Sequence, residues 1–129
     1  MSRPLAAALL NQPAITALVG TRRALKQLPA GTALPALVYT VVDVQPSDYF
    51  TGGYAGMRLQ INPLAATIGQ VQQIHDAVHG ALHGMADKPL AGLRVIAVRH
   101  ELIGPEDTST DDAGTVTWTW PADYIVIYE

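Results

Sequence analysis

A strand that leads directly into a capped helix is the feature that most constrains the fold of this chain. Apolar and polar residues alternate strictly over residues 57–62, which is the pattern of a strand with one buried face. Thr67 follows, and Gln70 three residues later completes the capping box that begins many helices. The next residues carry an apolar stripe at helical spacing, formed by Val71, Ile74, Val78, Ala81, Leu82 and Met85. The segment therefore predicts an α+β domain in which this helix packs on a sheet.

The other elements follow from proline and glycine positions and from β-branched runs. In chain order we expect a helix over 4–19 that breaks near 11–13, a connector over 20–35, a strand over 36–44, a loop over 45–55, a strand over 93–102, an acidic loop over 104–114, and a last strand over 115–129 that Pro121 interrupts. The order is α-β-β-α-β-β. We predict an antiparallel four-stranded sheet with two main helices packed on one face, in a single domain over residues 1–129.

The predicted sheet carries more apolar surface than two helices can cover. The strand over 36–44 is apolar on both faces, and strict alternation over 93–102 puts Val95 and Val98 on opposite faces. The chain is 49% hydrophobic and 15% charged, and the core of a protein interface is likewise depleted in charge. A neighbouring copy of the same protein is the simplest cover for the second face.

Composition excludes several classes of function. The chain has no cysteine, so disulfide frameworks, cysteine zinc sites and thiol catalysis are absent. The net charge is −3, and the cations Arg22, Arg23 and Lys26 are better interpreted as a solvated surface than as a nucleic-acid footprint. We expect no sequence-specific nucleic-acid partner and no membrane partner, because no apolar run approaches the ~20 residues of a membrane span.

Histidines on the central helix are the one candidate for metal chemistry. His75, His79 and His83 recur every fourth residue, and Asp76 lies on the same side as His79 and His83. Asp76, His79 and His83 could therefore form a three-ligand set. The preferred interpretation is that half-exposed imidazoles flank the apolar stripe, since the sequence has no HExxH glutamate. His100 is expected on a strand. We predict no catalytic residue, no cofactor and no enzyme activity.

Aromatic residues outside the helices are candidates for a subunit interface. Tyr49, Phe50 and Tyr54 lie in the predicted loop over 45–55, where aromatic side chains are unusual unless they make contacts. Trp118 and Trp120 alternate with threonines on the last strand and are expected in the core or at an interface.

Several segments, taken in order, resemble one family. They are Ala8–Gly20, Leu34–Tyr39, Arg58–Asn62, Ala65–Thr67, Val78–Leu82 and Asp123–Tyr128. In turn, strand and helix pattern the chain is similar to the tail completion, or tail-terminator, proteins of long-tailed bacteriophages and prophages. The resemblance covers almost the whole chain.

The resemblance implies a non-enzymatic structural protein of a phage or prophage tail. Such a protein assembles with itself as a ring, commonly a hexamer, which terminates the tail tube and joins it to the head connector. Its partners would be the tail tube protein and the head–tail connector protein, and its location the virion tail after assembly in the host bacterial cytoplasm. We expect the 45–55 and 104–114 loops to contact tube or connector. Two alternatives remain open: a metal-binding enzyme using the histidine helix, and a small dimeric ligand-binding α+β domain.

Overall fold

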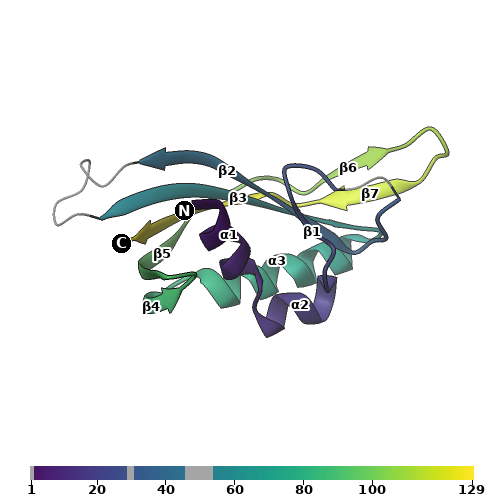
Figure 1. The fold of residues 1–129 in the computed structure, drawn as a ribbon. Coiled ribbons are helices and arrows are strands. Elements are labelled where there is room, and N and C mark those ends of the chain that lie inside the picture. Colours follow the sequence, from purple (N-terminus) through teal and green to yellow (C-terminus); the bar gives the residue numbers. More distant parts are fainter. Residues whose placement is uncertain (1, 29–30, 46–53) are drawn as a thin grey trace.

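The computed structural model describes residues 2–28, 31–45 and 54–129 (Figure 1). Most of the loop predicted over 45–55, including the interface candidates Tyr49 and Phe50, lies outside the described residues. None of the helices in the described part of the chain is both long enough and apolar enough to span a membrane.

The structure has three helices where the sequence predicts two main ones, because the break expected near 11–13 separates the first into two. They are α1 (Ser2–Leu10), α2 (Pro13–Val19) and α3 (Ile68–Leu82). Pro13 begins α2, where its missing N–H costs no hydrogen bond, and Gly20 ends it at φ 58°. Thr67 caps α3 as expected, because its side-chain oxygen accepts a hydrogen bond from the Gln70 N–H at 3.2 Å.

The predicted four-stranded antiparallel sheet is wrong. The structure is a mixed sheet of eight strands with three helices: β1 (Arg23–Leu25), β2 (Ala36–Gln45), β3 (Ala55–Ala65), β4 (Ala86–Leu90), β5 (Leu93–Ile103), β6 (Asp107–Thr110), β7 (Val116–Thr119) and β8 (Ala122–Tyr128). The main order is β1-β2-β3-β8-β5-β4, with β7 beside β3 and β6 beside β7. β1 runs parallel to β2, and the other pairs are antiparallel.

Short strands in segments that look like loops account for the difference. β1 lies in the predicted connector, where the Leu37 N–H donates to the Arg22 carbonyl at 2.9 Å. β4 precedes β5 through a two-residue turn in which Ala91 and Gly92 both have positive φ. β6 lies in the predicted acidic loop. Pro121 separates β7 from β8, so the predicted last strand is two strands.

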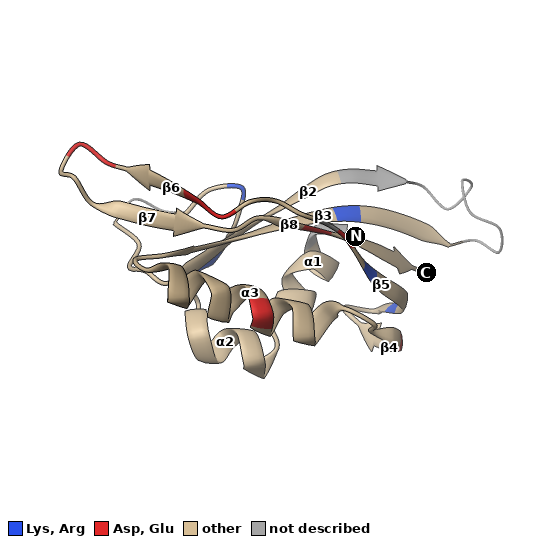
Figure 2. Ribbon diagram, turned by 180° about the vertical axis from the view of Figure 1, so that it is seen from behind, with Lys and Arg blue, Asp and Glu red and all other residues tan. Residues whose placement is uncertain are grey.

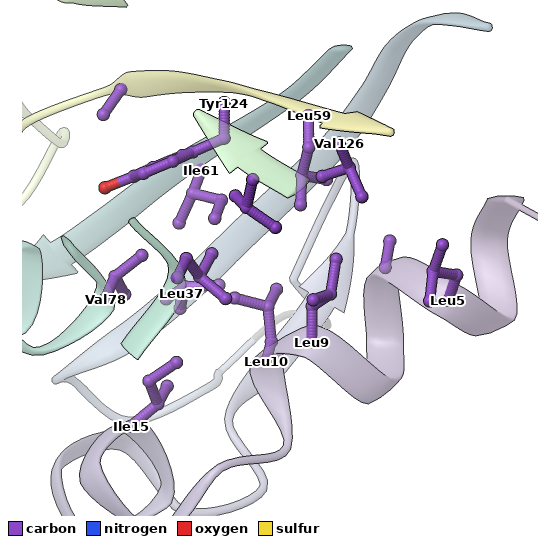
Figure 3. Close-up of a cluster of buried hydrophobic side chains, with 14 of the residues drawn as sticks. Leu5, Leu9, Leu10, Ile15, Leu37, Leu59, Ile61, Val78, Tyr124 and Val126 are labelled. Carbon is purple, nitrogen blue, oxygen red and sulfur yellow. The ribbon is translucent and has the colours of Figure 1, made fainter. Parts of the chain in front are cut away.

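The helices cover one face of the sheet, and the core lies between them (Figures 1 and 3). Buried side chains alternate along β3 and β8, as expected for strands with one face on a core. The largest fully buried side chains come from α1, α2, α3 and the central strands: Leu5, Leu9, Leu10, Ile15, Val19, Leu37, Met57, Leu59, Ile61, Ile74, Leu82 and Tyr124.

The opposite face of the sheet is less apolar than the sequence suggests. A register shift in β5 between Val95 and Ala97 breaks the alternation, so Val95 and Val98 are both buried rather than on opposite faces. On this outer face, Arg58 of β3 forms an ion pair with the buried Asp123 of β8 at 2.8 Å. Exposed aliphatic surface remains on β2, where Val42 is 53% exposed. The outer face is therefore mixed, with both charged and aliphatic side chains.

Candidate functional site

The histidines predicted on the central helix form part of a ring-stacking contact between α3 and the sheet. We call the set His75, His79, His83, His100, Trp120 and Tyr124 the histidine seam. His75 is only 6% exposed and stacks on Trp120, with ring centroids 3.9 Å apart. The Trp120 Nε1–H donates to the Gly104 carbonyl at 2.9 Å. The seam thus ties α3 to the chain on both sides of the β6–β7 hairpin.

The other half of the seam joins α3 to β5 and β8. The rings of His79 and His83 stack with centroids 4.8 Å apart, and the ring of His100 meets His79 edge-on at 5.2 Å. The backbone N–H of His100 donates to His83 Nδ1 at 3.4 Å. Tyr124 is fully buried, and its hydroxyl lies 3.5 Å from His79 Nδ1. Nothing in the sequence alone indicated that His100 would join the helix histidines, because the contact depends on how β5 lies beside α3.

The surroundings of His75 and His79 favour their neutral forms. Burial lowers the pKa of His75, and the neighbouring His79 and His100 lower it further against the opposing charges of Asp76 and Glu106. Burial, His83 and His100 likewise lower the pKa of His79, against Asp76. Burial also raises the pKa of Tyr124 to about 12, so its hydroxyl keeps its proton at neutral pH.

The structure does not assemble the proposed metal ligands. Asp76 is exposed on α3, whereas His79 and His83 face each other as stacked rings. The nitrogen atoms of stacked rings lie in nearly parallel planes. The ligands of a tetrahedral metal ion must instead all point at one position. Within the described residues there is no group of three or more His, Cys, Asp or Glu side chains that could hold a metal ion.

The aromatic interface candidates divide into three groups. Tyr49 and Phe50 lie outside the described residues, and Tyr54 is half-buried just before β3. Trp118 and Trp120 are half-buried and pack against the core, so each has an intramolecular role. Their part in an interface stays a prediction.

The β6–β7 hairpin extends beyond the helices at one end of the sheet (Figures 1 and 2). All of residues 107–116 are exposed. The segment over 104–120 contains Glu106, Asp107, Asp111 and Asp112 and no lysine or arginine. Asp111 holds the turn, because its Oδ1 accepts from the backbone N–H groups of Ala113 and Thr115 at 3.0 and 2.8 Å.

A basic segment lies at the other edge of the same end of the sheet. Arg22 and Arg23 donate to the carbonyls of Pro35 and Leu10 at 2.7 and 2.8 Å, and Lys26 is exposed. Arg23 also lines a cavity of about 300 Å³ between α1 and β2, together with Ala7, Ala8, Leu10, Asn11 and Tyr39. Among the described residues that line the cavity there is no second charged side chain and no pair of groups suited to acid–base or nucleophilic chemistry.

Residues 3–127, almost the whole chain, match the family described as tail completion protein gp17. The chain belongs to this family. In fold it is similar to a chain of a solved structure titled "Virion of native gene transfer agent (GTA) particle", with a TM-score of 0.67 and 19% identity, over 99% of this chain and 97% of that one. No curated protein matches it in sequence.

Family membership decides the class of protein. This tail completion protein is a structural component of a phage-type tail, and such components assemble with other virion proteins. Proteins of this family are typically not enzymes.

Proposed function

We propose that this tail completion protein forms a closed ring, expected as a hexamer, that terminates the tail tube and joins it to the head connector. The observation that carries the proposal is the family match over residues 3–127. The protein acts through its shape and its binding surfaces. Copies present complementary edges to one another, and no covalent bond is made or broken.

The edges of the sheet support a ring. Copies in a ring associate head to tail, so each copy needs two different surfaces that fit each other. At the end of the sheet near the β6–β7 hairpin, the strand order is β1-β2-β3-β7-β6, which leaves two different strands at the edges. Within the described residues, β1 and β6 each pair with one strand only.

The two ends of the molecule suit two further partners. The β6–β7 hairpin lies at one end, and the C-terminal end of β2 and the start of β3 lie at the opposite end (Figure 1). We assign the segment over 45–55 and the tip of the segment over 104–114 to the contacts with tube and connector. Opposite ends of one subunit can then meet different partners in a stacked assembly.

A tube-polymerisation assay tests this function. Purified tail tube protein is allowed to polymerise with and without this protein, and tube lengths are measured by electron microscopy. We expect added protein to stop growth and to appear as extra density at one tube end. Unchanged lengths and bare ends at saturating protein would overturn the proposal.

A further inference from the structure

Charge is distributed very unevenly along the chain. Residues 1–42 contain Lys and Arg but no Asp or Glu, whereas residues 101–129 contain Asp and Glu but no Lys or Arg. In the fold these two segments supply opposite edges of the sheet, β1 and β6. One edge is therefore basic and the other acidic.

We propose that the acidic start of the β6 edge in one copy contacts the basic start of the β1 edge in the next copy, with the two strands antiparallel. The proposal rests on the ring proposed above and names the surface that closes it. The occupant of each edge is a second copy of this chain.

The register places the two charged edges at nearly the same height on the sheet. Asp107 pairs with Thr119, which pairs with Leu64. Arg23 pairs with Leu37, one residue after the partner of Leu64. Asp107 and Arg23 are thus one row apart across the sheet. From this level β6 and β1 continue in opposite directions, so a rotation about an axis along the strands brings the starts of the two strands together, with Asp107 opposite Arg22 and Glu106 opposite Arg23.

Strand directions fit the same arrangement. β6 runs parallel to β3 because both are antiparallel to β7. β1 runs parallel to β2, and β2 is antiparallel to β3. β6 of one copy and β1 of the next therefore meet at their starts with antiparallel directions.

The edges differ in how they are protected. Proteins protect exposed edge strands with lysine and proline. β4, at the far edge of the sheet, contains Lys88 and Pro89, and Pro89 has no N–H to donate. β6 has the sequence Asp-Thr-Ser-Thr, with neither residue. β6 is therefore an open edge, and its charge selects for a basic partner.

The cations and carboxylates at the two edges are not used inside the subunit as ion pairs. Within the described residues no salt bridge includes Arg22, Arg23, Lys26 or an acidic residue of the hairpin. Arg22 and Arg23 donate to carbonyls of their own subunit, but no carboxylate in these salt bridges neutralises their charge. Opposite charges on a neighbouring copy would raise both association rate and specificity.

Charge reversal tests the pairing, with oligomeric state measured by size exclusion with light scattering. Asp107→Lys/Asp112→Lys and Arg22→Glu/Lys26→Glu should each weaken subunit addition by about tenfold or more. The chain that carries all four substitutions should regain the ring. Lys88→Glu/Arg99→Glu is the matched control: it changes the net charge as much as Arg22→Glu/Lys26→Glu does, and should leave the ring unchanged. Circular dichroism verifies that each variant folds.

Disulfide trapping gives an independent measurement, because the chain has no cysteine of its own. Thr108→Cys combined with Thr21→Cys, which the register places in the same row, should give a ladder of covalent oligomers on oxidation, since paired strands bring Cα atoms within bonding range. Thr108→Cys combined with Lys88→Cys should not.

The outcomes separate the two proposals. The edge contact is overturned if the wild type forms a ring, both reversal variants keep it, and the cysteine pairs give no ladder. The proposal of a ring would then still stand. A wild-type protein that stays monomeric at high concentration overturns the ring and the pairing together.

Discussion

The histidine seam and the β6–β7 hairpin lie next to each other and differ in almost every physical respect. In the seam, His75 stacks on Trp120 and His79 stacks on His83, while His100 of β5 and Tyr124 of β8 lie against His79 at an angle. His75 and Tyr124 are buried. In the hairpin every residue over 107–116 is exposed, and the charges are of one sign. The contacts of the seam hold α3 on the sheet within one subunit. The hairpin buries little of its own surface in the single chain.

Such a division is expected of a subunit that must fold before it assembles. Core contacts provide the free energy of folding, and edges provide specificity between copies. Substitutions in the core should therefore change stability, and substitutions in the hairpin should change assembly.

The largest effect should come from the core beneath the sheet. Leu59 on β3 is fully buried, and Leu59→Ala should lower the free energy of unfolding by about 2–5 kcal/mol. The hairpin control Thr108→Ala, at an exposed site, should change it by less than about 0.5 kcal/mol. Urea unfolding followed by circular dichroism measures both. Equal losses at the two sites would remove the distinction between core and hairpin.

The junction between the two regions should respond more moderately. Trp120→Phe keeps a ring on His75 but loses the hydrogen bond to the Gly104 carbonyl, and should cost about 1 kcal/mol. Trp120→Ala also removes the stacked ring and should cost about 3 kcal/mol. A Trp120→Ala variant as stable as the wild type would show that the stack does not hold α3 on the sheet.

The seam should make stability depend on pH. His75 and His79 have pKa values below the ordinary 6.5 in the fold, so the unfolded chain binds protons more readily. Their contribution is complete above about pH 6.5 and is lost as the pH falls through the folded pKa values. The melting temperature should therefore fall on acidification below pH 6.5, and His75→Gln should reduce that dependence. A melting temperature that rises over the same range would reverse the assigned sign.

The smallest effect is expected at the hairpin turn. Asp111→Ala removes two hydrogen bonds to backbone N–H groups in an exposed turn and should cost about 0.5–1 kcal/mol. Asp112→Ala, next to it, should cost less than about 0.5 kcal/mol. Faster amide exchange of Thr115 in the first variant, and not in the second, would locate the loss in the turn. Equal exchange in both would contradict the role given to Asp111.

Helices and long strands were predictable from the sequence because their signals are local. Thr67 and Gln70 fix the start of α3, and alternation fixes the buried face of β3. The short strands were not predictable. Three residues in a connector, Arg23–Leu25, carry no periodic signal, and their strand exists only because β2 lies alongside. The four polar residues of β6 also carry no periodic signal, and they form a strand because β7 lies alongside.

Only the part of the histidine seam that lies on α3 could be predicted from the sequence. Helical spacing places His75, His79 and His83 on one side of α3, but the contact with His100 depends on β5, whose register shifts break the simple alternation. The described residues contain no group of three or more metal-ligating side chains, and the rings of His79 and His83 stack on each other.

Native mass spectrometry of the purified wild-type protein, with class averages from electron microscopy, tests the central claim most directly. We predict a single closed species of defined copy number, ring-shaped with a central opening, that dissociates as the NaCl concentration rises from about 0.05 M to about 1 M. A protein that remains a monomer at every concentration in low salt would contradict the account.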